Sequence, residues 1–435
     1  MSEKLGLLGA VSIALGGMIG GGIFAVLGVV AEMSGAAAWI AFFGGGIVAF
    51  CAGYSYIRLQ RVGDVSGGSV SFLEEFIDST TITGMVGWTL LFGYIGSMGM
   101  YAFAFGSFAT RLLGVEAAFG VPLRPIVSIV AILGFVGLNV VGARASGLTE
   151  VLLVGAKVGI LLVFGVWGFY FGARTGQLTT GLSSSVEAGG LLMSAALSFV
   201  AFQGWQLLFY DEESLRDART TIPRAIYLSI PLSLGLYILV AVVTTGLLQP
   251  ETIAANPEVS LAIAAEPFMG RIGFALISVA ALFSTGSAIN ATLFSAARFA
   301  TGMLEDDLLP DQIGDADADG APTRPLLVLG LITATFTAYG SLQGITSFAS
   351  LAFITVFGSM SLLAFRNREG LRTGVLPAVG VLGAVLFFPS LVYHLAVMEP
   401  AVFGVVLVVT VVLIGLEVLY FERETIRSGI DGVRR

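Results

Sequence analysis

The sequence of 435 residues is poor in charge and has a single cysteine and a single histidine. Charged residues make up 11% of the chain, against about a quarter in a soluble domain, and 56% are hydrophobic. The lone Cys51 excludes an intramolecular disulfide and a cysteine metal cluster. With one histidine, no H-E-x-x-H motif and no basic patch, the sequence predicts no enzyme activity, no cofactor or metal, and no nucleic-acid binding.

Long apolar segments take up most of the chain. A helix needs about 20 apolar residues to cross the hydrocarbon core of a bilayer. Charged or turn-rich breaks divide the sequence into twelve such segments, near 6–31, 37–58, 82–113, 122–142, 148–172, 188–210, 223–248, 270–302, 325–340, 343–365, 373–394 and 400–421. We therefore expect an all-α polytopic membrane protein with twelve transmembrane helices and the lipid bilayer as its surroundings.

The distribution of Lys and Arg predicts the orientation. With this segment map, sixteen of the 21 basic residues fall on the side of both termini, four fall on the other side, and Lys157 lies inside a span. Cytoplasmic loops carry the excess of positive charge. The sequence thus predicts a multi-pass protein of the cell membrane with both termini in the cytoplasm.

Within the first span, the stretch SIALGGMIGGGIFAVLG (12–28) contains six glycines. Glycine costs about 1 kcal/mol per residue in a helix relative to alanine. One explanation is close helix packing, which small residues permit. The other is a discontinuous helix whose free N–H groups bind an anion near the bilayer midplane. We favour the interruption, because close packing at a spacing of four does not account for three consecutive glycines.

The sixth span is also irregular. In LSFVAFQGWQLLFYDEE (197–213), Gln203, Gly204 and Gln206 lie within an apolar run, and buried amides need hydrogen-bond partners. Interrupted helices at corresponding positions of two halves are typical of inverted-repeat transporters. We expect a 5+5 inverted-repeat core with discontinuous helices one and six. Its first repeat would span 1–172 and its second 173–366, followed by 367–435 with helices eleven and twelve and a cytoplasmic tail.

Four stretches, in order, resemble motifs of the amino acid–polyamine–organocation transporter superfamily, in its amino acid permease branch. They are GGMIGGGIF, YSYIRLQRVGDVSGGSVSFLEEF, AFQGWQ…EES…IPRAI and STGSAINATLFSAARFATGMLEDDLLP. The resemblance covers nearly the whole chain. It implies a secondary active transporter of amino acids that works by alternating access, with a LeuT-like fold.

The resemblance also implies a substrate site made largely of backbone groups. The N–H groups of Gly20, Gly21 and Gly22 would hold the substrate carboxylate, and carbonyls of Met18, Val200 and Gln203 would hold its ammonium. Phe202 and Trp205 would cover the substrate, with Gly204 and Gln206 completing the site.

The chain departs from the family pattern at two positions of this site. Gly21 and Gln206 stand where many members have Ser and Glu. Without a carboxylate to pair with a cationic side chain, the site favours neutral amino acids.

Lys157 is a basic residue near the middle of a span. A charge there costs at least about 2.5 kcal/mol on insertion scales, so it marks a functional hypothesis. The resemblance places it behind the first span, near carbonyls of Gly16 to Met18 and the hydroxyls of Ser284 and Thr285, where sodium-coupled relatives hold a cation. We expect these three side chains to couple transport to a proton gradient. Asn290 is a further candidate.

Several alternatives stay open at this stage. The chain could be an amino acid exchanger in which Lys157 is structural, a transporter of cationic amino acids or polyamines, or a metal-ion transporter of the same fold. Its oligomeric state, monomer or homodimer, is also undetermined by the sequence.

Overall fold

A computed structural model describes residues 4–77, 79–141, 147–179, 188–306, 308–309, 314 and 322–416. The described residues are almost entirely helical. The elements are α1 (Leu7–Ser34), η1 (Gly35–Ala37), α2 (Ala38–Gly63), α3 (Ser69–Phe76), α4 (Thr80–Leu113), β1 (Ala117–Ala118), β2 (Val121–Pro122), α5 (Leu123–Val140), α6 (Gly147–Thr175), α7 (Ala188–Ser198), η2 (Phe199–Phe202), α8 (Leu207–Tyr210), η3 (Glu212–Ser214), α9 (Ala218–Leu247), α10 (Pro250–Ala255), η4 (Pro257–Val259), α11 (Ser260–Ile263), α12 (Glu266–Glu305), α13 (Thr323–Tyr339), α14 (Leu342–Arg366), α15 (Leu371–Met398) and α16 (Pro400–Leu416).

The predicted all-α polytopic class is confirmed. Each of the twelve predicted segments falls on one helix or, for the sixth, on the series α7, η2 and α8. Nine helical stretches within the described ranges are long and apolar enough to cross a membrane, and the first of them, Leu7–Gly63, contains both α1 and α2. The predicted tail beyond residue 416 lies outside the described residues.

Local sequence explains several helix ends. Ser79 begins α4, because its hydroxyl accepts a hydrogen bond from the N–H of Ile82 at 3.3 Å. Ser341 begins α14 in the same way, accepting from the N–H of Gly344 at 2.9 Å. Gly114 ends α4 in the left-handed conformation that glycine adopts without strain.

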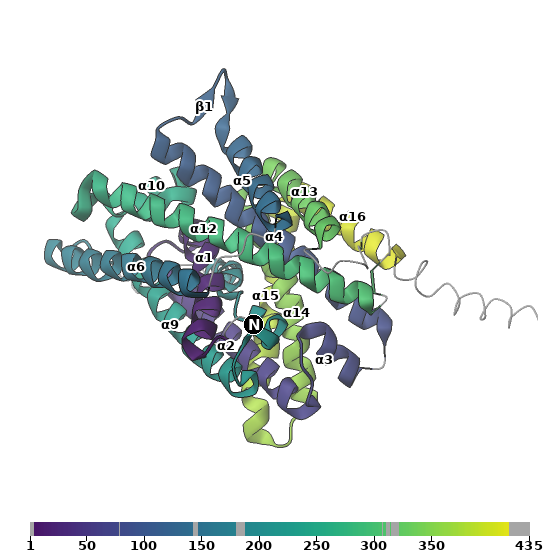
Figure 1. The fold of residues 1–435 in the computed structure, drawn as a ribbon. Helices are drawn as coiled ribbons and strands as arrows, with labels where there is room; N and C mark the ends of the chain where they lie inside the picture. The colour runs from purple at the N-terminus through teal and green to yellow at the C-terminus, as the bar shows by residue number, and fades with distance from the viewer. Residues whose placement is uncertain are drawn as a thin grey trace, which may run out of the picture.

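Helix α1 lies inside the bundle (Figure 1). It packs against α4, α6, α7, α9 and α12. Of the 18 most apolar consecutive residues in the α1–α2 stretch, 94% are buried. The corresponding share is 22% in α5 and 28% in α15. The first span is therefore central, whereas α5 and α15 present apolar side chains outward.

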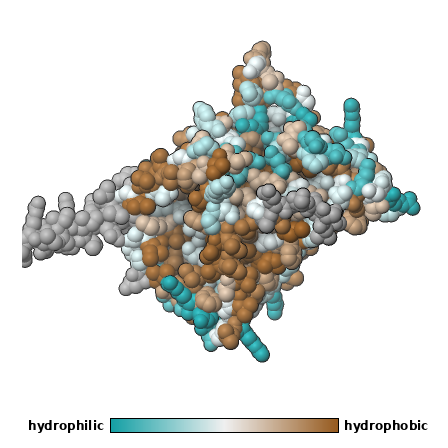
Figure 2. Space-filling model, turned by 180° about the vertical axis from the view of Figure 1, so that it is seen from behind, coloured by the Kyte–Doolittle hydropathy of each residue, from teal (hydrophilic) through white to brown (hydrophobic). Residues whose placement is uncertain are grey.

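The outward surface fits a lipid environment. Figure 2 shows a broad apolar area on one face, with hydrophilic residues at its margins. Exposed side chains of α6 and α15 are among the large apolar residues on the surface; they include Val163, Val166, Trp167, Leu382 and Val385. Contiguous exposed apolar surface marks contact with a partner or a membrane, and on helices of spanning length it fits contact with lipid.

Candidate functional site

The predicted interruption of the first span is wrong for this structure. Residues Leu7–Ser34 form one continuous α-helix that includes Gly20, Gly21 and Gly22. The N–H groups of these glycines belong to the helix, so they do not form an open anion site in this conformation.

The three consecutive glycines instead allow three different neighbours to approach α1. A Cβ on Gly20 would lie 2.7 Å from the Cβ of Ala288 in α12. One on Gly21 would overlap the ring of Tyr101 in α4, and one on Gly22 would lie 2.6 Å from the carbonyl oxygen of Ala201 in η2. Successive helical residues point about 100° apart, so a helix enclosed on all sides needs small residues in succession rather than at a spacing of four.

The predicted interruption of the sixth span is confirmed. Helix α7 ends at Ser198, and a short 3-10 segment, η2, runs to Phe202. Gln203 is extended and Gly204 has φ 130°, after which α8 begins at Leu207. Only glycine adopts this φ without strain, so Gly204 fixes the position of the interruption.

The two embedded amides supply hydrogen bonds to the interrupted segment. The N–H of Gly204 donates to Gln206 Oε1 at 2.6 Å, and Gln206 Nε2 donates to Gln203 Oε1 at 3.0 Å. Gln203 Nε2 in turn donates to the hydroxyl of Tyr101. Gln203 and Gln206 are 2% and 0% exposed, so these partners replace bonds that water would otherwise make.

The interrupted segment lies directly against the glycine-rich part of α1. A Cβ on Gly17 would lie 2.7 Å from the Cα of Gly204, and one on Gly204 would lie 2.6 Å from the carbonyl carbon of Gly17. Backbone thus meets backbone at this point. The sequence correctly predicted that these two stretches face each other, although only one of them is broken.

The remaining predicted substrate residues are buried around this contact. Met18, Val200, Phe202 and Trp205 are all 0% exposed. The ring of Phe202 packs on Tyr237 of α9 at 5.1 Å between centroids.

The two aromatic candidates therefore do not converge in this conformation. Trp205 packs on Tyr56 of α2 and Phe357 of α14, at 5.0 and 5.1 Å. Of the two predicted covers for the substrate, Phe202 thus lies toward α9 and Trp205 toward α2 and α14.

Lys157 contacts α1 as predicted, but its hydroxyl partner on α12 is Ser287. Its ammonium donates to the carbonyl of Gly16 at 3.3 Å and to Ser287 Oγ at 3.4 Å, and the residue is 5% exposed. The lysine of α6 thereby connects α1 and α12.

The two hydroxyls predicted beside Lys157 make other bonds. Ser284 donates to the carbonyl of Ile19 at 3.1 Å, which joins α12 to α1 one turn further along. Thr285 donates within its own helix, to Ala281 at 2.7 Å. Ser287 was missed, although it lies only two residues from Thr285.

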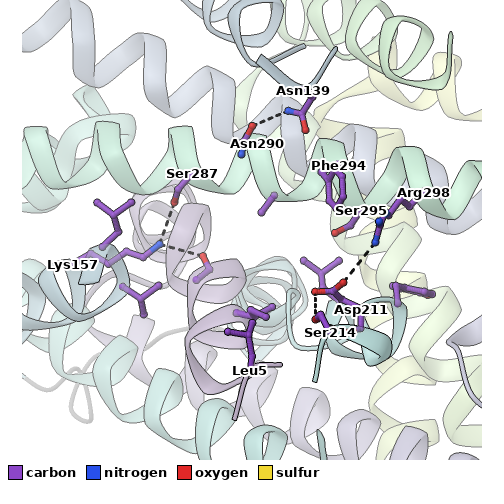
Figure 3. Close-up of a pocket in the computed structure, with 17 residues that line it drawn as sticks. Leu5, Asn139, Lys157, Asp211, Ser214, Ser287, Asn290, Phe294, Ser295 and Arg298 are labelled. Carbon is purple, nitrogen blue, oxygen red and sulfur yellow. Dashed lines mark hydrogen bonds and ion pairs between the residues drawn. The ribbon is translucent and has the colours of Figure 1, made fainter. Parts of the chain in front are cut away.

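Lys157 lines a cavity of about 300 Å³ between α1, α5, α6, α8 and α12 (Figure 3). Leu5 also lines it, so the cavity lies on the side of the amino terminus. The N–H of Leu5 donates to the carbonyl of Ser214 at 2.9 Å, and Leu5 accepts from the N–H of Arg216 at 2.8 Å. These bonds attach the start of the chain to the segment that follows span six.

Polar residues that the sequence did not single out line the same cavity. Asn139 of α5 donates to the side chain of Asn290 at 2.7 Å. Asp211, after α8, lies 3.7 Å from Arg298 of α12 and accepts from the hydroxyl of Ser214 at 2.6 Å (Figure 3). Nothing in the local sequence marks Asn139, since a single amide in a span is compatible with simple helix packing.

The described residues contain no group of three or more His, Cys, Asp and Glu side chains placed to hold a metal ion. The polar groups that line the cavity are amides, hydroxyls, the ammonium of Lys157 and the ion pair of Asp211 and Arg298. A buried interruption in one apolar span, packed against another span, is typical of helical membrane transporters with discontinuous helices.

Comparison with known proteins identifies the family. The profile described as "Amino acid permease" matches residues 5–424, so the chain belongs to the amino acid permease family. It is a membrane transporter rather than an enzyme, and its class of substrate is the amino acids.

Relatives of this chain include proteins of archaea and bacteria. An uncharacterized protein of Methanocaldococcus jannaschii is 30% identical over 82% of this chain and 81% of its own length. The inner membrane transport protein YbaT of Escherichia coli is 28% identical over 91% of both chains. The serine/threonine exchanger SteT of Bacillus subtilis is 26% identical over 71% of this chain and 70% of its own.

Proposed function

We propose that this protein is a proton-coupled symporter of neutral amino acids in the cell membrane, with both termini in the cytoplasm. The observation that carries the proposal is the contact between Gly17 and Gly204, with Lys157 bonded to the neighbouring carbonyl of Gly16. The substrate region and the titratable group therefore act on the same helix, α1.

The substrate site lies between α1 and the interruption, lined by Gly20 to Gly22, Met18, and residues Val200 to Gln206. The side chains here that can reach a substrate are apolar, aromatic or amides, and Phe202, Gln203 and Gln206 are buried. A zwitterion needs donors and acceptors a few ångströms apart, which an interrupted helix offers from backbone alone.

Access alternates through separation of α1 from the interrupted span. The cavity on the amino-terminal side ends at Gly16, one residue before the contact with Gly204. On the opposite side, a Cβ on Gly28 would overlap the backbone of Pro257 in η4, so that loop covers the other end of α1. Given the predicted orientation, this conformation has its cavity on the cytoplasmic side.

Lys157 supplies the proton-dependent step. Its ammonium can donate to Gly16 and Ser287 together, and so holds α1 to α12; the neutral amine loses this charge-assisted bonding. Loss of the proton therefore weakens the link between α1 and α12 at this point. Ser284 holds the next turn of α1 through Ile19 in either state.

Reconstituted vesicles test the coupling. We expect an inward proton gradient to drive amino acid uptake into empty vesicles, and replacement of sodium by choline to leave uptake unchanged. Uptake that requires preloaded amino acid and ignores the gradient contradicts symport.

Amino acid exchange is a second candidate function, and the hydrogen bonds of Lys157 are compatible with it. Lys157 makes two hydrogen bonds that join three helices, an arrangement that a permanently charged structural lysine also satisfies. The similarity to the serine/threonine exchanger SteT supports the same alternative. The preloading experiment separates the two functions directly.

A further inference from the structure

Tyr101 of α4 occupies the space beside Gly21. A Cβ on Gly21 would overlap the Cδ1 and Cε1 atoms of the Tyr101 ring, so the ring lies directly on the backbone of α1. The residue is 1% exposed and sits in the middle of a 34-residue helix. Glycine at position 21 is therefore a requirement of this tyrosine, since any other side chain would displace the ring.

The hydroxyl of the same tyrosine reaches the interrupted span. It accepts a hydrogen bond from Gln203 Nε2, and Gln203 is bonded to Gln206, which binds the N–H of Gly204. One side chain of α4 thus contacts both halves of the proposed substrate site, α1 through its ring and the interruption through its hydroxyl.

The other neighbours of the glycine triplet contact it through small groups or backbone atoms. Gly20 faces the methyl group of Ala288, and Gly22 faces the backbone of Ala201. Tyr237 approaches Gly22 with its hydroxyl, which is held by the carbonyl of Ala201 at 3.0 Å. Tyr101 is the neighbour whose aromatic ring lies against the triplet, because Tyr237 approaches Gly22 only with its hydroxyl.

We propose that Tyr101 is a specificity-determining residue that limits the substrate to neutral α-amino acids with small side chains. Its ring lies against α1 at Gly21 and its hydroxyl reaches Gln203 of the interruption, so the side chain bounds the space between the two on the side of α4. The inference rests on the proposed function, because it assigns the substrate site to the space between α1 and residues 200–206.

The test measures binding of alanine and leucine to purified full-length protein, by thermal stabilisation and by competition for uptake in vesicles. We expect the native protein to prefer alanine. Tyr101→Ala removes the ring and should raise the affinity ratio of leucine to alanine by at least about tenfold, since even one methylene in a pocket is worth that factor. Tyr101→Phe keeps the ring and should keep the native ratio.

A paired substitution tests the role of Gly21. Gly21→Ala alone should abolish binding of both amino acids, because its Cβ takes the place of the ring. The Gly21→Ala/Tyr101→Ala protein has no ring for the new Cβ to overlap. Binding should therefore return, with the raised leucine-to-alanine ratio expected of Tyr101→Ala. A double variant that binds no better than Gly21→Ala contradicts the proposed pairing.

Tyr94 provides a matched control on the same helix. It is a fully buried tyrosine two turns earlier, packed on Phe299 and Phe353 rather than on α1. Tyr94→Ala should lower thermal stability without changing the leucine-to-alanine ratio. If Tyr101→Ala does not fold, Tyr101→Leu serves the same comparison with a smaller cavity.

The outcomes separate the two proposals. A Tyr101→Ala or Tyr101→Leu protein that binds amino acids with the native ratio overturns the specificity role and leaves the proposed function intact. A folded native protein that binds no amino acid in either assay overturns the proposed function itself.

Discussion

Two glycine-bearing stretches lie in contact at the centre of this bundle, yet one is a continuous helix and the other is broken. The stretch Gly17 to Gly22 in α1 has four glycines and remains helical, whereas Gln203 to Gln206 has one glycine and does not. Low helix propensity is therefore insufficient to break a buried helix. Backbone groups released in an apolar interior need replacement partners.

The side chains nearby account for the difference. In span six, Gln206 accepts from the N–H of Gly204, and Gln203 holds Gln206. Around the triplet of α1 the neighbours in sequence are Met18, Ile19 and Ile23, none of which can replace a helical hydrogen bond. The amides permit the interruption in one span, and their absence keeps the other helical.

The largest effect is expected at the contact itself. Gly204→Ala places a Cβ against the backbone of Gly17 and strains a φ of 130°. Overpacking and backbone strain together should lower the free energy of unfolding by about 3 kcal/mol and abolish uptake. Thermal unfolding and vesicle uptake measure both.

Gly235→Ala is the control for that substitution, because a Cβ on this α9 glycine meets nothing within 4 Å. It should unfold at the native temperature or slightly above. Equal losses of stability and uptake in the two variants would argue against a specific contact between α1 and the interruption.

The next largest effect concerns coupling. Lys157→Met removes the ammonium that joins α6 to α1 and α12, while the proposed substrate groups lie on other helices. We expect uptake to lose its increase at low outside pH, with amino acid binding retained within about threefold, a difference of roughly 0.6 kcal/mol. Uptake at graded outside pH and thermal stabilisation by alanine measure these two properties.

Lys157→Arg tests whether this position must gain and lose a proton, because arginine stays protonated. A variant with arginine that retains full pH dependence would show that another group carries the proton. Retention of symport by Lys157→Met would assign the lysine a structural role only.

A smaller effect sharpens the role of the amides. Gln206→Ala leaves the buried N–H of Gly204 without its acceptor, which should cost roughly 1–3 kcal/mol of stability. Gln206→Glu keeps an acceptor, loses the donor to Gln203 and adds a buried carboxyl group. At a pH low enough to keep that group neutral, the variant should unfold at a temperature between those of the native protein and the alanine variant. The reverse order would mean that the bond to Gly204 does not support the interruption.

The smallest effect is expected at the ion pair that lines the cavity on the side of the amino terminus. Arg298 and Asp211 are 46% and 39% exposed and 3.7 Å apart. Arg298→Gln should therefore change stability by less than about 1 kcal/mol, and less still at high salt. Arg219→Gln, in the more exposed pair with Asp64, is the comparison; a larger loss at Arg298 would indicate that its pair closes the cavity.

Much of the fold and part of the site could be predicted without coordinates. Twelve apolar segments correspond to the helices because a spanning segment must satisfy its own backbone, so hydropathy alone marks it. The interruption of span six was predictable because two amides and a glycine stand out in an apolar run. The position of Lys157 beside Gly16 followed from the family pattern.

Only the tertiary structure decided what the glycines of α1 do. Their sequence is compatible with a break or with close packing, and the choice depends on Ala288, Tyr101 and Ala201, which lie far away along the chain. The same holds for Ser287, Asn139 and Asp211, which meet in one cavity only after the helices pack. Local composition fixes which segments span the membrane, since each must satisfy its own backbone, but the contacts that fill and shape a site are made between segments.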